Sequence, residues 1–311
     1  MYRFLLKRAA GLIFVMLAVS FITFIMGYFA PGDPIQAMMG NHFNPPLYHQ
    51  LKHEYGLDLP WWQQYVNFLA NILHGTFGLS YQYPGQNAWD VLERGLPYSI
   101  DLGLEVLVMT LVIGIPLGIV SALRANSHLD TSITTIIMTL YAVPDIALII
   151  SFQILMVLLY NNGLPYLPVA GWDNWQSHIG PVLITATTGA GYFTRFTRTT
   201  VLEVLGQDFV RTARAKGLRE QAVIGRHVMR YAFIPVLTSI GFTLGYLVTG
   251  VFITEQFFNI PGVSQVTLNA ISQRDYTVLQ ASVVLTSISV VVFNALTDVA
   301  YALFDPRIRL E

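Results

Sequence analysis

Six stretches without a charged residue follow one another along the chain, and most are long enough to cross a lipid bilayer. They cover residues 9–32, 106–123, 146–172, 174–194, 231–254 and 276–297. A helix needs about 20 apolar residues to span the hydrocarbon core. The third stretch extends back to Thr131 if the single charge of Asp145 is accepted. The pattern therefore predicts an all-α integral membrane protein with six transmembrane helices.

The composition supports this assignment. Hydrophobic residues make up 54% of the 311-residue chain and charged residues only 11%, and the mean hydropathy is +0.53, which is far from the composition of a soluble domain. The formal net charge is −1. Membrane orientation accounts for the basic residues, so nucleic acid is not expected as a partner. The chain contains no cysteine, which excludes disulfides and thiol chemistry.

The lysine and arginine residues define the expected orientation. Cytoplasmic loops of membrane proteins carry an excess of these residues. With the N-terminus inside, only Lys52, Arg94 and Arg274 of the 17 cations fall on the outer side. We therefore predict that both termini are cytoplasmic. The apolar run at 9–30 is longer than the core of a signal peptide, and no small-x-small site closes it, so it is interpreted as a permanent anchor.

A long extracytoplasmic segment, residues 31–98, follows the first span. Within it, Asp58 and Pro60 begin an expected amphipathic helix whose aromatic residues suit the membrane interface. His49 and His53 lie four residues apart and could chelate a metal on one helical face, but no third ligand is in view. The preferred alternative is a solvated polar face, so no metal site is predicted.

Residues 195–231 form the only long basic segment between the hydrophobic stretches, and apolar residues recur in it at helical spacing. Lys216 and Gly217 are typical of a helix end, because a cation suits the last turn and glycine accepts a positive φ. We therefore predict two short amphipathic helices that meet at Gly217 and form an elbow between two spans. A partner could dock on such an elbow. The alternative is that the charges only set the topology or contact anionic lipid.

Asp145 is the one charge clearly within a span, and it directly follows Pro144. A carboxylate in mid-span costs on the order of 3 kcal/mol on insertion scales, so it should not face lipid. It either lines a hydrated translocation path, where it would favour cationic or N-terminally charged cargo, or has a structural role, in which it binds a neighbouring Ser, Thr or Arg or is protonated within the bundle. Closer to the outer interface, the second span begins with Asp101 and Glu105.

Residues 255–276 separate the fifth span from the sixth, and the chain is expected to turn back within them. Pro261 lacks an N–H group and Gly262 is conformationally free. Irregular backbone at membrane depth is tolerated only where protein buries it or water lines it. An ordinary surface loop is the alternative. The predicted outer gate consists of Phe258, Asn259, Ile260, Pro261 and Gly262.

No common enzyme motif occurs in the chain. It lacks the phosphate-binding motif GxxxxGK[ST], the hydrolase motif GxSxG and the metal-binding motifs HExxH and CxxC. We therefore expect no catalytic residue and no cofactor bound by this chain. A six-span protein without its own energy-coupling site uses an ion gradient, opens as a channel, or is driven by a partner.

The letters DFVRTARAKGL at residues 208–218 resemble the EAA loop of ABC-importer permeases, in the form found in peptide permeases. Other signatures of that family follow in the right order: PGDP at 31–34, YGLDLP at 55–60, GTFGLS at 75–80, EQFFNIPG at 255–262, RDY at 274–276 and DPRIR at 305–309. Each is weak alone, but the ordered set covers nearly the whole chain. The chain is similar to the first permease subunit of dipeptide, oligopeptide and nickel importers.

The resemblance implies a type I ABC-importer permease fold, with the first span outside a five-helix core. It also implies a second homologous permease, two cytoplasmic ATPase subunits that bind ATP and Mg, and an extracytoplasmic solute-binding protein. Arg211 stands where the general motif has glutamate, and Pro235 lies further from Gly217 than in sugar importers, as is ordinary in the peptide branch. The residues that would couple to an ATPase are Asp208, Arg211, Ala213, Arg214, Lys216, Gly217 and Leu218.

The expected organisation is an N-terminal span with its extracytoplasmic segment at 1–94, a transmembrane core at 95–305 and a cytoplasmic tail at 306–311. The expected setting is the bacterial or archaeal cytoplasmic (inner) membrane. The expected function is ATP-driven import of di- or oligopeptides, with nickel or another small solute as an alternative cargo. A gradient-driven secondary transporter and a non-transport membrane scaffold are the rival classes. The chain shows no internal repeat of the kind common in secondary transporters.

Overall fold

The computed structural model describes residues 2–40, 43–245 and 251–304. All regular secondary structure in these residues is helical, apart from an isolated antiparallel bridge between Leu79 and Asn87. The predicted DPRIR motif and the tail at 306–311 lie outside the described residues. In chain order the elements are α1 (Tyr2–Tyr28), α2 (Pro34–Met39), α3 (Pro45–Glu54), α4 (Trp61–Leu73), α5 (Ala88–Leu92), α6 (Leu96–Leu123), α7 (His128–Ala142), α8 (Asp145–Asn161), α9 (Trp175–Leu205), α10 (Asp208–Ala215), α11 (Glu220–Ala222), the π-helix η1 (Val223–Val228), α12 (Met229–Gly245), α13 (Phe252–Phe257), α14 (Val263–Ser272) and α15 (Tyr276–Phe304).

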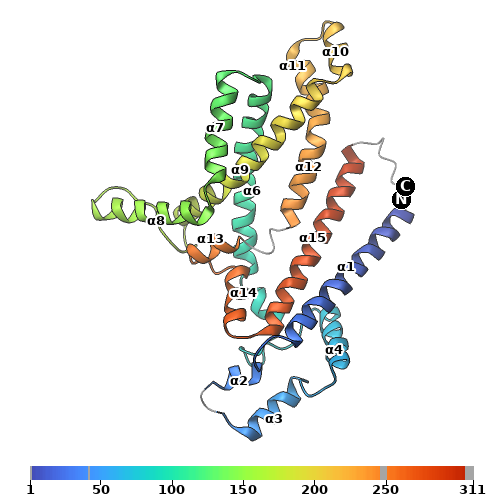
Figure 1. Cartoon of the computed structure of the whole chain (residues 1–311), viewed down its shortest axis with the longest axis vertical. Coiled ribbons are helices and arrows are strands. Elements are labelled where there is room, and N and C mark those ends of the chain that lie inside the picture. The colour runs from blue at the N-terminus through green and yellow to red at the C-terminus, as the bar shows by residue number, and fades with distance from the viewer. Residues whose placement is uncertain (1, 41–42, 246–250, 305–311) are drawn as a thin grey trace.

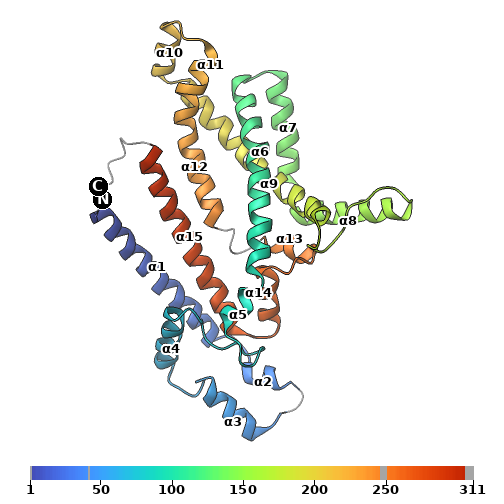
Figure 2. The ribbon, with the colours of Figure 1, turned by 180° about the vertical axis from the view of Figure 1, so that it is seen from behind.

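The helices form an elongated bundle with different structures at its two ends. Figures 1 and 2 show α10 and α11 at one end and α2 and α3 at the other. The first residues of α1 and the last turns of α15 both point toward the end that carries α10. The described ends of α1 and α15 thus lie toward the same end of the bundle as the basic stretch, while their position on the cytoplasmic side stays a prediction.

Four segments of the described chain are long and apolar enough to cross a membrane, and α7 with α8 adds a fifth if the two count as one broken span. The predicted fourth span corresponds to α9, which is 31 residues long but is not among these segments. The structure therefore supports four or five of the six predicted spans, and the sixth stays a prediction. The four segments are Gly11–Tyr28, Leu96–Leu123, Glu220–Gly245 and Tyr276–Leu296.

The predicted third span, which contains Pro144 and Asp145, consists of two helices rather than one. α7 and α8 meet at a bend of 91°. Pro144 lies at this break, and it explains the bend because proline pushes the preceding residue out of the helical region. Val143 accordingly has an extended ψ of 127°. α8 then projects sideways from the bundle (Figure 1). The predicted fifth span also differs, since α12 is described to Gly245 and Ile253 belongs to the separate helix α13.

The centre of the bundle is the pair α6 and α9, whose backbones approach closely at two glycines. A Cβ on Gly114 would lie 2.8 Å from the Cβ of Phe193, and one on Gly118 would lie 2.7 Å from the carbonyl oxygen of Thr194. Small residues allow such contact between membrane helices. Because α7, α8 and α12 also pack against α9, this helix connects most of the bundle.

α1 stands at the edge of the bundle, where it packs mainly against α15 and α4 (Figures 1 and 2). Its contact with α4 is aromatic: the Phe24 ring lies 5.3 Å from the Tyr65 ring and 6.2 Å from the Phe68 ring. Phe14 and Ile22 on its free surface are exposed, as suits a helix in lipid. This position agrees with the first helix outside the core that the resemblance implies.

Signature motifs that are distant in sequence meet at the outer end of the molecule. The Tyr276 hydroxyl donates to the Pro31 carbonyl oxygen over 3.0 Å. Asp275 is buried, and it accepts hydrogen bonds from the Ser80 hydroxyl and from the Gln82 N–H. These bonds join the extracytoplasmic segment to the first turn of α15. The motifs therefore have a structural role here in addition to marking the family.

Candidate functional site

The elbow, defined here as residues 208–222, lies at one end of the molecule between α9 and α12 (Figure 1). α10 is followed by Lys216 as its C-cap. Gly217 then takes φ +73°, and its N–H donates to the Arg214 carbonyl oxygen over 2.9 Å. A residue without a Cβ adopts this conformation at little cost. The positive φ predicted at Gly217 is confirmed.

The inner face of the elbow is packed against the bundle. Val210 and Ala213 of α10 are buried, as are Val223 and Val228 of η1, and all four share one apolar cluster with residues of α6, α9 and α12. Ala213 therefore anchors the elbow, and its side chain faces the bundle rather than an incoming partner. Any part that Ala213 plays in coupling is indirect.

An ion pair braces the elbow across Gly217. The Arg214 guanidinium donates two hydrogen bonds to Glu220, over 2.6 Å and 3.2 Å. Because Arg214 is engaged within the chain, the cations most available to a partner are others of the predicted set.

The face of the elbow that points away from the bundle, called its outer face here, is exposed and carries both basic and apolar side chains. Arg211, Lys216 and Leu218 project from it, and Leu218 is 44% exposed although it is apolar. Asp208 at the start of α10 is also exposed, with its carboxylate 3.5 Å from the Arg211 guanidinium. An exposed leucine among cations suits a partner groove that offers apolar and acidic groups.

The second arm of the elbow differs from the predicted short amphipathic helix. α11 passes directly into η1 and then into α12, so that residues Glu220–Gly245 form one membrane-length segment. Phe209 in α10 packs on Tyr231 in α12, with ring centroids 4.9 Å apart. A force applied to the elbow is therefore transmitted to α12 without an intervening loop.

Arg198, which belongs to the predicted basic stretch, is directed into the bundle. Its guanidinium donates to both oxygens of Asp130, over 2.8 Å and 2.7 Å. Asp130 is 4% exposed, and it also accepts hydrogen bonds from the Ser121 hydroxyl and the Asn126 N–H. The pair joins α7 to α9 near the end of α6. Arg198 thus stabilises the bundle beneath the elbow.

The outer turn, residues 258–262, reverses the chain between α13 and α14; Phe258, Ile260 and Gly262 are buried, and Asn259 and Pro261 are exposed. Phe258 and Ile260 are fully buried and pack in a cluster with residues of α6, α8 and α9. Asn259 has φ +51°, and its side-chain oxygen accepts a hydrogen bond from Gln265 over 3.0 Å. The geometry differs from an ordinary surface loop and agrees with the predicted turn.

Glu255 is a site residue that the sequence did not single out. It is fully buried, accepts a hydrogen bond from the Ser99 hydroxyl over 2.7 Å, and accepts another from the Ser264 N–H over 2.9 Å. Burial raises the pKa of its carboxyl above the ordinary value. A Cβ on Gly262 would lie 2.2 Å from the Glu255 carboxylate, so glycine is required there. Glu255 therefore holds the outer turn against the start of α6.

Asp145 does not lie in the middle of a helix. It is the first residue of α8, where the helix dipole favours a carboxylate, and it accepts a hydrogen bond from the Thr188 hydroxyl. It also lines a cavity of about 560 Å³ between α6, α9 and the start of α13. The bond to Thr188 agrees with the alternative in which Asp145 binds a neighbouring threonine, while a place in the translocation path stays a prediction.

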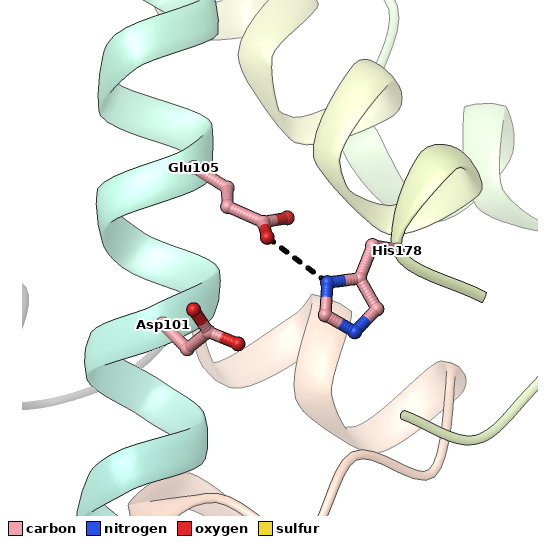
Figure 3. A group of neighbouring side chains, drawn as sticks. All are labelled: Asp101, Glu105 and His178. Carbon is pink, nitrogen blue, oxygen red and sulfur yellow. Dashed lines mark hydrogen bonds and ion pairs between the residues drawn. The ribbon is translucent and has the colours of Figure 1, made fainter. Parts of the chain in front are cut away.

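The His49 and His53 pair gains no third ligand among the described residues, and the His53 Nδ1 atom instead pairs with Asp58 at 2.7 Å. A different set of potential ligands does converge: Asp101, Glu105 and His178 (Figure 3). Their convergence could not be read from the sequence, because His178 is 73 residues away from Glu105.

Comparison with known families identifies the chain. A family described as "Binding-protein-dependent transport system inner membrane component" matches residues 114–310, and the corresponding N-terminal component matches residues 1–103. The chain belongs to this permease family. It is a permease subunit of an ABC importer of the dipeptide and glutathione type. Membership argues against the gradient-driven transporter and the membrane scaffold.

Curated relatives match over the whole length of this permease. The glutathione transport system permease protein GsiC of Escherichia coli strain K12 is 33% identical over 311 residues, and the match covers 100% of both chains. The dipeptide transport system permease protein DppB of Bacillus subtilis strain 168 is 34% identical over 314 residues, which cover 100% of this chain and 99% of DppB.

Two solved structures share the fold of this permease. The MetNI methionine ABC transporter in inward-facing conformations has a TM-score of 0.56 and 17% identity, and the match covers 69% of this chain and 96% of that one. An amino acid ABC transporter with histidines has a TM-score of 0.51 and 13% identity, and the match covers 75% of this chain and 97% of that one. Identities this low show a common architecture alone.

Proposed function

We propose that this permease forms a translocation path for di- or oligopeptides together with a second, homologous permease. In this proposal two cytoplasmic ATPase subunits bind ATP and Mg, and an extracytoplasmic solute-binding protein delivers the cargo. Membership in the family implies ATPase and binding-protein partners in general, while their number and arrangement are part of the proposal. The permease itself carries out no covalent chemistry.

The proposed topology has six spans with both termini cytoplasmic, in the bacterial inner membrane. α9 supplies the fourth span, and the broken pair of α7 and α8 supplies the third. The N-terminal unit is residues 1–94, the core is 95–305 and the tail is 306–311. A reporter inserted within 206–222 is expected to be cytoplasmic, and one within 40–55 to be external. A cytoplasmic signal from the second fusion would contradict this topology.

The observation that carries the proposal is the construction of the elbow. Its inner face is buried, and its outer face exposes cations and Leu218. Gly217, with a backbone φ of +73°, forms the turn between its two arms. A loop that only set topology or contacted lipid would need neither the bracing ion pair nor the continuous link to α12. We therefore assign the outer face as the docking surface for an ATPase subunit.

The transport step follows from the connections of the elbow. Closure of the ATPase subunits moves the elbow, and α9 and α12 move with it because they adjoin its two arms. Packed interfaces change between discrete arrangements rather than deforming smoothly. The cavity that Asp145 lines lies between α6, α9 and the start of α13, so movement of α9 changes its shape. The outer turn serves as the external gate of this path.

Small peptides are the proposed cargo, because the relatives above carry the names of dipeptide and glutathione systems. Nickel or another small solute is the alternative. The test is uptake by the complete complex in proteoliposomes, with ATP supplied on the cytoplasmic side. ATP-dependent uptake of dipeptides or glutathione, unaffected by excess nickel, supports peptide import. Uptake of nickel but of no peptide would contradict it.

A further inference from the structure

The outer ends of α6 and α9 carry a cluster of potential metal ligands that the proposed transport step leaves unused. Asp101 and Glu105 lie one helical turn apart on α6, and His178 lies in the first turn of α9. One ligand atom from each lies within 4.8 Å of the others. Figure 3 shows both carboxylates directed toward the imidazole, and His178 Nδ1 lies 3.0 Å from Glu105 Oε1. The cluster therefore bridges the two central helices.

Trp172 holds two of these three side chains in place. Its indole N–H donates to Asp101 Oδ2 over 3.1 Å, and its ring stacks on His178 with centroids 3.6 Å apart and an interplanar angle of 16°. The indole is itself packed in the apolar cluster that contains Phe258. A hydrogen bond from an outer residue to a ligating carboxylate is a usual feature of metal sites, because it orients the ligand.

The charge of the cluster favours a cation. In the described part of the chain, neither Asp101 nor Glu105 forms an ion pair with a lysine or an arginine. The Glu105 side chain is 38% exposed and that of His178 is 21% exposed. Two carboxylates thus stand beside an imidazole in a cluster that the surrounding described residues do not fully enclose.

We propose that Asp101, Glu105 and His178 bind a divalent transition-metal ion of the Zn²⁺ class. One imidazole nitrogen and two carboxylate oxygens match the ligands that zinc prefers, and three protein ligands leave a fourth position for water or another ligand. Mg²⁺ and Ca²⁺ favour oxygen ligands alone, so the histidine discriminates against them. Zinc–ligand bonds are about 2.0–2.2 Å long, so the ligands must draw slightly closer together than they stand now. The bound ion ties the outer end of α6 to that of α9.

The test is Zn²⁺ binding to the purified full-length permease in detergent, after treatment with a chelator and in competition with a chromophoric zinc indicator. We expect one saturable Zn²⁺ site per chain and no competition from Mg²⁺. The midpoint temperature of thermal unfolding should rise with Zn²⁺ concentration. Asp101→Asn, which keeps the acceptor for the Trp172 N–H, and His178→Gln should each weaken binding at least about 10-fold. His53→Gln is the matched control, because it removes an exposed outer histidine and should leave binding unchanged.

A further variant distinguishes a specific loss of Zn²⁺ affinity from a loss of folded protein. Trp172→Phe keeps an aromatic ring over His178 but removes the donor to Asp101, and we expect affinity to fall about 10-fold or more while one equivalent still binds. Zn²⁺ binding that is equal in wild type and His178→Gln would overturn the proposal. Absence of saturable binding in a wild-type protein with a cooperative thermal transition would also overturn it, leaving only the hydrogen bond between His178 and Glu105.

Discussion

Gly217 shows how one residue sets the geometry of the elbow. Its φ is +73°, and no atom lies within 4 Å of the point where a Cβ would stand. A side chain at this position therefore meets no neighbour, and its cost is the backbone conformation alone. Asparagine tolerates the left-handed region better than other residues, and β-branched residues tolerate it least.

Gly217→Val should destabilise the elbow locally by about 1 kcal/mol or more. We expect cargo-stimulated ATP hydrolysis by the assembled complex and recovery of ATPase subunits on purification to fall, while membrane insertion is retained. Gly217→Asn is the matched control and should stay close to wild type in both measurements. Unchanged stimulation of ATP hydrolysis in Gly217→Val would count against coupling through the elbow.

Glu255 makes the stability of the outer turn depend on pH. Burial raises its pKa in the folded protein above the ordinary value of 4.5. Folding therefore favours the protonated form, so this contribution to stability is fully present below pH 4.5 and is lost as the pH rises through the raised pKa. We expect the thermal stability of wild type, relative to Glu255→Gln, to fall across this range. A difference that does not vary with pH would contradict the assignment.

Removing the charge of Asp145 tests whether this residue contributes to the translocation path. Asp145→Asn keeps the shape of the side chain and an acceptor for the Thr188 hydroxyl, but it removes the charge that lines the cavity. We expect uptake of positively charged peptides to fall by several-fold while uptake of neutral peptides is spared. Measured with the reconstituted complex, equal uptake of both cargo classes would leave Asp145 a structural residue.

One buried contact holds together the ends of α6, α7 and α9 that lie nearest the elbow. Asp130 in α7 receives both hydrogen bonds from Arg198 in α9, together with one from Ser121 in α6. Removing one partner of a buried ion pair is costly, because the other charge is left without compensation. Ser121 directly precedes Ala122, which belongs to the apolar cluster that holds the elbow.

Asp130→Asn should lower the free energy of unfolding by about 2 kcal/mol, a value below that of a fully buried pair because Arg198 is partly exposed. Thermal unfolding of the detergent-solubilised permease measures the change. Arg211→Gln is the control, since its partner Asp208 is exposed and 3.5 Å away, and surface pairs contribute little. Equal stability of the two variants would show that the Asp130 contact is not structurally important.

The elements that the sequence predicts well are those with local signals. Lys216 and Gly217 predict a helix end, and in the structure α10 ends there, with the expected positive φ at Gly217. The sequence does not predict that the third span divides into two helices, because a proline is compatible with either a kink or a complete break, and at Pro144 the structure has a break of 91°. Glu255 was missed because its partner Ser99 is 156 residues away. Such long-range pairs leave no periodic pattern in a single sequence.

Packed helices connect the outer turn with the elbow at the other end of the molecule. The elbow continues into α12, α9 packs against α6, α7, α8 and α12, and the outer turn packs against α6, α8 and α9. A movement imposed at one end therefore reaches the other through packed helices. In the proposed function, this movement comes from an ATPase subunit bound to the outer face of the elbow.

The most direct measurement is site-specific cross-linking, which the absence of native cysteine in this chain makes simple. Leu218→Cys places a thiol on the exposed face of the elbow, and His49→Cys places one on the extracytoplasmic segment as the control. After treatment of the assembled complex with a short bifunctional reagent, we expect a permease–ATPase product from position 218 and none from position 49. No such product from position 218, in a complex that hydrolyses ATP on addition of cargo, would contradict this expectation.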